Sequence, residues 1–169
     1  MNYHNITHDD MKNGDGLRVV LWVAGCEHHC PECQNPQTWD SESGIPFDEH
    51  ALGEILEELQ KDYVSGITFS GGDPLAPCNE AKVSDICYSI KHLAPFKTIW
   101  VYTGYTYEEL KERHSPFTED ILAKADVLVD GEYKKDLRDV QLKWRGSSNQ
   151  RVIDLKKSLA ENKVVLWCD

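Results

Sequence analysis

Short apolar runs recur along this chain, and the segments between them have the apolar spacing of helices. An uninterrupted apolar run is typical of a strand that is buried on both faces of a sheet. The runs predict strands at 17–24, 65–70, 98–102 and 127–129, and 164–167 is a candidate for the last strand. Residues that directly follow these segments are therefore candidates for a functional site at the strand ends.

Three segments between the strands carry helix signals. Phe47 and Leu52 have the spacing of a hydrophobic staple at the start of one helix. Thr106 and Glu109 have the spacing of a capping box at the start of another. Residues 79–93 form a weaker amphipathic pattern. This alternation predicts an α/β fold with a mainly parallel sheet and right-handed crossovers.

Composition narrows the class of protein. The chain has 169 residues, of which 40% are hydrophobic, and no Gly-, Ser- or Pro-rich linker divides it, so we expect one domain over 1–169. Six cysteines without a secretory signal predict reduced thiols and a cytoplasmic location. No stretch is long enough to span a membrane. The 18 basic and 29 acidic residues give a net charge of −11, which argues against nucleic acid as the main partner.

Three cysteines follow the first predicted strand with C-x3-C-x2-C spacing. They are Cys26, Cys30 and Cys33, within eight consecutive residues. Four thiolates would close a tetrahedral metal site, whereas three thiolates on a [4Fe-4S] cluster leave one iron without a protein ligand. The spacing therefore favours an iron–sulfur site with one iron open for chemistry.

Structural zinc is the alternative at the same loop. His28 or His29 could complete a Cys3His set. A fourth thiolate could also come from elsewhere in the fold, from Cys78, Cys87 or Cys168. Structural zinc usually takes its ligands as two separated pairs, whereas this chain places three in one loop. Both metals accept thiolates, so the spacing alone leaves zinc open.

The later predicted strands run into loops rich in glycine and polar residues. The segments concerned are 71–75, 103–105 and 130–132. The carboxyl ends of parallel strands meet at one edge of a sheet, so these loops are expected to lie beside the cysteines. Gly71 and Gly72 remove side chains where backbone must approach a ligand. An ordinary turn is the alternative, and the neighbouring cysteine loop favours a binding site.

The cysteine loop and Ser70-Gly-Gly-Asp-Pro-Leu75 together resemble radical S-adenosylmethionine enzymes. The wider pattern resembles the activating proteins of anaerobic (class III) ribonucleotide reductase. The matching segments are Met1-Asn-Tyr-His4, Asn13-Gly-Asp-Gly16, Asn35, Trp39, Trp100-Val-Tyr-Thr-Gly-Tyr105, Val127-Leu-Val-Asp-Gly131 and Trp144-Arg-Gly-Ser-Ser-Asn-Gln150. Many radical enzymes have an aromatic residue just before the third cysteine, where this chain has Glu32.

The resemblance implies a specific chemistry. S-adenosylmethionine would chelate the open iron through its amino and carboxylate groups, which holds its sulfonium close to the cluster. One electron from the reduced cluster would cleave the cofactor and leave a 5′-deoxyadenosyl radical. That radical would take a hydrogen atom from a glycine of the large subunit of anaerobic ribonucleotide reductase. The electron would come from an external donor such as a flavodoxin.

The resemblance also implies roles for individual residues. The cluster ligands are Cys26, Cys30 and Cys33. The acceptors for the methionyl ammonium are Gly71, Gly72 and Asp73. The residues that flank Cys33 and contact the adenine side through backbone groups are Glu32 and Gln34. The candidates for the ribose or the carboxylate are Thr103, Gly104 and Asp130, where a turn or a cap is the alternative. Residues 149–151 are interpreted as a structural loop.

Chain length limits the architecture. A full (β/α)8 barrel takes about 250 residues, so the resemblance and the length together predict a partial, open TIM-like barrel. An open side suits a protein substrate, since small-molecule sites enclose their ligand. Two other functions stay open: an activating enzyme for a different glycyl-radical protein, and a non-catalytic zinc-binding module.

Overall fold

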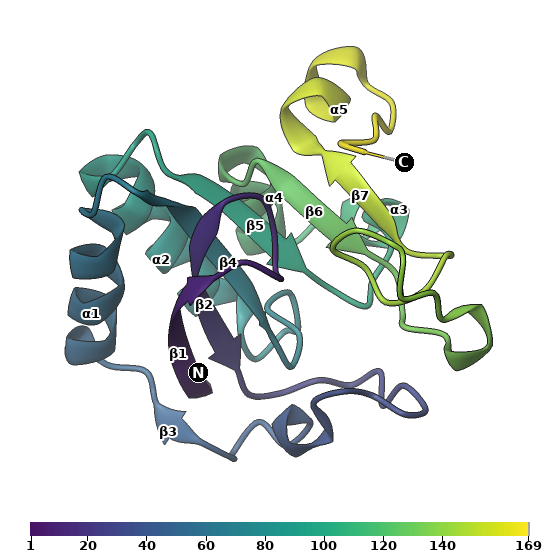
Figure 1. Ribbon diagram of the computed structural model, residues 1–169, viewed down its shortest axis with the longest axis horizontal. Coiled ribbons are helices and arrows are strands. Elements are labelled where there is room, and N and C mark those ends of the chain that lie inside the picture. Colours follow the sequence, from purple (N-terminus) through teal and green to yellow (C-terminus); the bar gives the residue numbers. More distant parts are fainter. Residues whose placement is uncertain (169) are drawn as a thin grey trace.

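A seven-stranded mixed sheet forms the centre of the computed structural model, which describes residues 1–168 (Figure 1). In order across the sheet, the strands are β3 (Ile45–Pro46), β1 (Asn2–Asp10), β2 (Leu17–Val23), β4 (Val64–Gly71), β5 (Thr98–Tyr102), β6 (Val127–Asp130) and β7 (Arg151–Asp154). The four strands β2, β4, β5 and β6 are parallel. The pairs β3–β1, β1–β2 and β6–β7 are antiparallel. The predicted α/β class and parallel centre are confirmed.

Helices connect the parallel strands, and one more helix follows β7. They are α1 (Glu49–Leu59) between β2 and β4, α2 (Glu80–Leu93) between β4 and β5, α3 (Tyr107–Glu112) and α4 (Pro116–Lys124) between β5 and β6, and α5 (Leu155–Glu161) after β7. Short 3-10 turns occupy Pro36–Thr38 and Lys135–Leu137. The predicted capping box of α3 is present in both directions, from the Thr106 side chain and from the Glu109 side chain.

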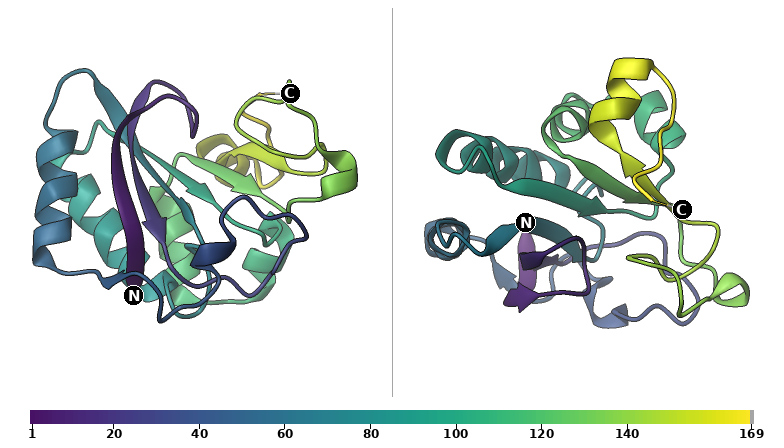
Figure 2. Two further views of the ribbon diagram at one scale, coloured as in Figure 1. Left: turned by 60° about the horizontal axis from the view of Figure 1, so that its bottom comes forward. Right: turned by 45° about the horizontal axis from the view of Figure 1, so that its top comes forward.

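The loops that follow the four parallel strands share one edge of the sheet, because neighbouring parallel strands all end there. The loop after β2 carries the three cysteines, and the loop after β6 runs from residue 131 to 150. Figure 2 shows these two loops side by side, although about 100 residues separate them along the chain. The predicted meeting of the strand-end loops is confirmed.

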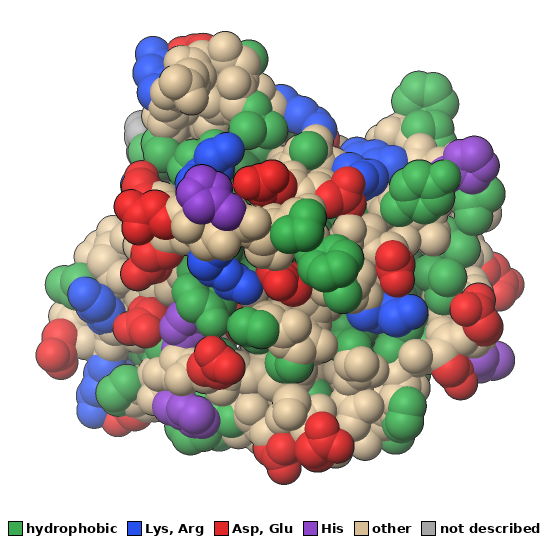
Figure 3. All heavy atoms as spheres, turned by 180° about the vertical axis from the view of Figure 1, so that it is seen from behind, with side chains coloured by type: hydrophobic (Ala, Val, Ile, Leu, Met, Phe, Trp, Pro, Cys, Tyr) green, Lys and Arg blue, Asp and Glu red, His purple; other side chains and the backbone are tan. Residues whose placement is uncertain are grey.

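Charged side chains of both signs cover the outside of the molecule. On the face opposite the view of Figure 1, acidic and basic side chains are interspersed with hydrophobic ones (Figure 3). Within residues 1–168, no helix is long and apolar enough to cross a membrane.

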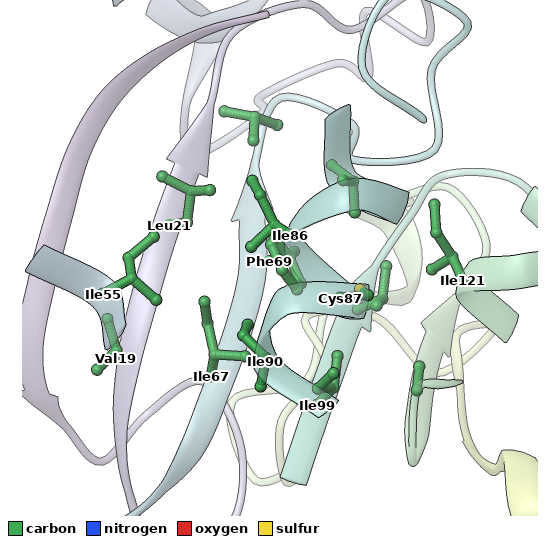
Figure 4. Packing of buried hydrophobic residues seen from close by; sticks show 14 of the residues in the cluster. Val19, Leu21, Ile55, Ile67, Phe69, Ile86, Cys87, Ile90, Ile99 and Ile121 are labelled. Carbon is green, nitrogen blue, oxygen red and sulfur yellow. The ribbon is translucent and has the colours of Figure 1, made fainter. Parts of the chain in front are cut away.

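The larger apolar core lies between the sheet and its helices. Alternate side chains of β2, among them Val19 and Leu21, point toward Ile55 of α1 and Ile86 of α2 (Figure 4). All four are 0–1% exposed. Burying one such side chain contributes about 1.5–3 kcal/mol, so this layer fixes the sheet and the positions of the strand ends.

The opposite face of β2 buries a charge. Arg18 is 0% exposed, and its Nε donates a hydrogen bond to the Thr68 hydroxyl at 2.8 Å. Its Nη2 donates to the Ile67 carbonyl at 2.6 Å, and its Nη1 donates to the Thr98 hydroxyl at 2.9 Å. The guanidinium carbon lies 5.3 Å from the centre of the Trp100 ring. Burial lowers the pKa of Arg18 to about 10, and these polar contacts offset the cost of burying the charge.

Several elements differ from the expectations. The predicted strand at 164–167 is wrong: Leu166 makes only an isolated bridge to Ile153 of β7. Strand β1 was not expected, because its sequence is polar and only Ile6 in it is buried. Strand β7 and helices α4 and α5 were also not expected, since each is a short segment whose apolar pattern spans few residues.

Replacing Arg18 should destabilise the fold. Arg18→Met removes the guanidinium and leaves buried hydroxyl and carbonyl groups without a donor, so we expect the free energy of unfolding to fall by about 2–4 kcal/mol. Urea denaturation measures this change. The matched control is Arg138→Met at an exposed position, which should change stability by no more than about 0.5 kcal/mol. Equal stability of the two variants would contradict this account of Arg18.

Candidate functional site

A cleft of about 560 Å³ opens at the edge where the parallel strands end. Its walls come from the loops after β2, β4, β5 and β6 and from residues 10–13. The volume lies in the range of cofactor sites in proteins. The sequence-predicted residues that line it are Cys26, Cys30, Cys33, Gln34, Gly71, Gly72, Asp73, Thr103 and Gly104. We call it the strand-end cleft.

The cysteine loop is held in place by its own backbone. The Gly25 amide donates to the carbonyl of Thr38 at 2.7 Å, and the Cys26 amide donates to the carbonyl of Trp39 at 3.0 Å. Within the loop, the Cys33 amide donates to the Cys30 carbonyl at 3.0 Å. The chain therefore turns back on itself after β2, and all three thiols are free and half-buried.

Backbone amides surround the sulfur atoms. Burial raises the pKa of Cys26 to about 11, and the amides of His28 and His29 act against this rise. Burial also raises the pKa of Cys30, with the Tyr133 amide acting in the opposite direction. The Asn35 amide donates to the Cys33 sulfur at 3.3 Å. Amide donors favour the thiolate form, which is the form that binds metals.

The three cysteines outside the loop, which were considered as a source of a fourth thiolate, lie in different parts of the fold. Cys87 is fully buried in the core on α2, and Cys168 packs against the second apolar cluster, which contains Trp100. Cys78 is exposed, with its sulfur beside Gly25. Within residues 1–168, no three His, Cys, Asp or Glu side chains converge closely enough to hold one metal ion.

Asp73 connects three of the loops. Its carboxylate is 1% exposed, and Oδ1 accepts a hydrogen bond from the Leu75 amide at 2.8 Å. Oδ2 accepts from the Thr103 hydroxyl and from the Gly104 amide, both at 2.9 Å. The Nε2 atom of His28 lies 2.9 Å from the same oxygen. The carboxylate thus ties the glycine turn to the end of β5 and to the cysteine loop.

His28 extends this connection to β6. Its Nδ1 lies 3.0 Å from Glu132 Oε1, and its ring meets the Tyr105 ring edge-on at 4.4 Å between centroids. The hydrogen bond with Asp73, followed by the contact with Glu132, raises the pKa of His28. A Cβ atom on Gly104 would lie 2.4 Å from the His28 ring, so only glycine fits beside the imidazole.

The glycine turn packs directly against the start of the cysteine loop. Gly71 has φ +102°, and a Cβ atom there would lie 2.7 Å from the Val23 backbone. A Cβ atom on Gly72 would lie 2.4 Å from the carbonyl oxygen of Gly25. The Asp73 amide donates to this same carbonyl at 2.8 Å. Both glycines are therefore required by contacts within the protein.

Two sequence-predicted residues lie away from the walls of the cleft. Glu32 is exposed in a left-handed backbone conformation (φ +57°), and its carboxylate pairs with Lys135. Asp130 is 1% exposed, pairs with Arg151 and accepts a hydrogen bond from the Tyr107 amide at 2.8 Å. Its carboxylate caps α3 from the end of β6, which agrees with the alternative noted from the sequence.

Several wall residues were not expected from the sequence. The aromatic ones are Trp22, Tyr102, Tyr133 and Trp144, and Arg145 and Gln150 lie with them. Trp22 and Tyr102 sit on strands, where the alternation of side chains would have placed them on the face away from α1 and α2. The others belong to the long loop after β6, whose path depends on contacts far along the chain.

The loop after β6 is stabilised by side-chain amides. Gln150 donates from Nε2 to the Gly131 carbonyl at 2.9 Å and accepts at Oε1 from the Gly146 amide at 2.9 Å. Asn149 donates from Nδ2 to the Glu132 carbonyl at 2.8 Å. These two amides thus make structural contacts, and Gln150 also lines the cleft.

Comparison with known proteins agrees with this geometry. The family described as "4Fe-4S single cluster domain" matches residues 12–153. The anaerobic ribonucleoside-triphosphate reductase-activating protein of Enterobacteria phage T4 is 41% identical over 152 residues, which cover 90% of this chain and 93% of that protein. The proteins of the same name from Escherichia coli K12 and Pasteurella multocida are each 42% identical, over 92% and 89% of this chain and over 100% and 95% of their own lengths. The chain therefore belongs to the family of anaerobic ribonucleoside-triphosphate reductase-activating proteins and carries a 4Fe-4S single cluster domain.

Proposed function

We propose that this protein activates an anaerobic ribonucleoside-triphosphate reductase by radical chemistry with S-adenosylmethionine. The observation that carries the proposal is the strand-end cleft, in which three cysteines face a turn of two glycines. The names of the relatives supply the protein substrate. One electron from the cluster would cleave the cofactor, and the 5′-deoxyadenosyl radical would remove a hydrogen atom from a glycine of the large reductase subunit.

In this proposal the cluster is held by Cys26, Cys30 and Cys33. The donor set fits a [4Fe-4S] cluster, because all three cysteines line the cleft and the Asn35 amide donates to the Cys33 sulfur. Three thiolates leave the fourth iron to the amino-acid end of S-adenosylmethionine. The task of the protein is to fix the thiolates and to keep that position accessible.

The cofactor would lie along the other walls. Backbone carbonyls of Gly71 and Gly72 would accept hydrogen bonds from the methionyl amino group, and Gln34 would meet the adenine side. Thr103 and Gly104 would lie near the ribose. Asp73 already has four donors on its carboxylate, so we infer that it acts mainly by holding these walls together.

The proposed roles of Glu32 and Asp130 are limited by the ion pairs that their carboxylates already make. Glu32 would reach the adenine side through its backbone, since its carboxylate is paired with Lys135. Asp130 would support the β6 end rather than touch the ribose, since its carboxylate is buried against Arg151.

We also infer that the sheet is one wall of a partial, open TIM-like barrel within a single radical S-adenosylmethionine domain over 1–169. The helical layer on one face of the sheet and the cleft at its edge support this view. An open side would admit a loop of the reductase. A cytoplasmic reductant such as a flavodoxin would supply the electron.

The three loop cysteines should be essential for the cluster. Cys26→Ala, Cys30→Ala and Cys33→Ala should each abolish cluster assembly, because each would bind a different iron. The measurement is iron and labile sulfide per chain after anaerobic reconstitution. Cys78→Ala is the matched control, since this thiol lies beside the same loop but does not line the cleft, and it should keep full iron. Full iron in the Cys30→Ala protein would refute the assignment.

Gly72→Ala should disturb the cluster as well as the cofactor. The new methyl group would meet the Gly25 carbonyl directly before Cys26, so the cysteine loop must shift. We expect lower iron content and weaker binding of S-adenosylmethionine. Gly53→Ala is the control, because a Cβ atom there has open space, and it should leave iron unchanged and stabilise α1 by about 1 kcal/mol. Full iron with weakened binding would mean that Gly72 serves the cofactor alone.

Activation of the reductase tests the proposed function directly. Anaerobic incubation of the reconstituted protein with reductant, S-adenosylmethionine and the large reductase subunit should give a persistent glycyl radical, detected by electron paramagnetic resonance, together with methionine and 5′-deoxyadenosine. The Cys30→Ala protein is the control and should give neither. Cofactor cleavage without a radical on the reductase would keep the chemistry and refute the partner.

A further inference from the structure

Residues 144–150, which we call the 144–150 loop, form a fixed wall of the strand-end cleft. Trp144, Arg145 and Gln150 all line the cleft. The Gln150 side chain accepts hydrogen bonds from the Gly146 amide at 2.9 Å and the Ser147 amide at 3.1 Å. Together with the bonds that Gln150 and Asn149 make to the loop after β6, this leaves the loop little freedom. A side chain on this loop is therefore preorganised for binding a ligand.

Arg145 is the cation on this wall. In residues 1–168 its guanidinium makes one hydrogen bond, from Nη1 to the Gln150 carbonyl at 3.1 Å. Its Nε is buried and has no hydrogen-bond partner. An arginine has five N–H donors, and a buried donor without an acceptor is costly. The protein alone therefore leaves most of this guanidinium without acceptors.

Three other arginines with buried or half-buried side chains, Arg18, Arg113 and Arg151, have acceptors in the structure. Arg113 Nη2 lies 3.0 Å from Glu80 Oε2, and Arg151 pairs with Asp130 and Glu108. The donors of Arg18 have acceptors on β4, on β5 and at the Asp15 carbonyl. Arg145 differs from these three, because it faces the cleft and has no carboxylate partner among the described residues. In a chain with a net charge of −11, an unpaired cation in a cleft favours an anionic ligand.

We propose that Arg145 binds the carboxylate of the amino-acid end of S-adenosylmethionine, an assignment that rests on the proposed function. A guanidinium matches a carboxylate in shape and charge, and the cofactor carries one carboxylate. Its amino group would donate hydrogen bonds to backbone carbonyls of the glycine turn in the same cleft. The protein thus offers a carbonyl acceptor to the amino group and a cation to the carboxylate, and the 144–150 loop positions that cation.

The test compares two ligands on anaerobically reconstituted protein with full iron. One is S-adenosylmethionine, and the other is decarboxylated S-adenosylmethionine, which keeps the amine and lacks the carboxylate. Arg145→Met should weaken binding of the first about 10- to 100-fold in equilibrium dialysis and change binding of the second less than about twofold. Arg145→Lys should restore part of the affinity, since lysine keeps the positive charge but cannot make the two parallel hydrogen bonds of a guanidinium. Lys143→Met, the same charge change at an exposed neighbour, should leave both affinities unchanged.

Each contrary result overturns the assignment in a recognisable way. Equal loss for the two ligands, in a protein whose iron content and circular dichroism are those of the wild type, would make Arg145 a structural residue. Unchanged affinity of Arg145→Met for S-adenosylmethionine, with a lower radical yield on the reductase, would assign the cation to a carboxylate of the partner protein. Absence of S-adenosylmethionine binding by the wild-type protein would overturn the proposed function itself, and this assignment with it.

Discussion

The buried carboxylate of Asp73 is the interaction on which the site depends. A carboxylate can be withdrawn from water only if donors replace its hydration, and here four groups do so. They come from the cysteine loop, the glycine turn and the end of β5, which are far apart in sequence. The requirement to satisfy one charge therefore fixes the relative positions of three loops that would otherwise be free to move separately.

Close backbone contact is the second condition for this arrangement. The parallel strands bring their loops to one edge, but side chains would still keep the loops apart. Gly72 and Gly104 remove them where the turn meets Gly25 and where the His28 ring lies. The same positions that bring a ligand near to backbone groups also bring one loop near to the next, so the packing of the protein and the shape of the cleft have a common cause.

The sequence predicts the central part of the fold better than its margins. Strands β2, β4, β5 and β6 are buried on both faces, so they appear as apolar runs, whereas β1 and β7 are stabilised by pairing that their own residues do not reveal. The apolar end of the chain suggested a strand at 164–167, but its residues make only one bridge to β7. In the site, spacing predicted that the cysteines and the glycine turn would share a cleft. The positions of Arg145 and of the Asp130 carboxylate depend on hydrogen bonds between distant loops, which no local pattern encodes.

The hydrogen bonds that hold the cysteine loop bear on what happens when oxygen destroys the cluster. The Gly25 and Cys26 amides bond to the backbone of residues 38 and 39, and the His28 ring bonds to carboxylates. None of these contacts uses a sulfur atom, so none of them depends on a bound metal. Loss of the iron by oxidation would therefore leave these hydrogen bonds available to hold the cysteine loop for a new cluster.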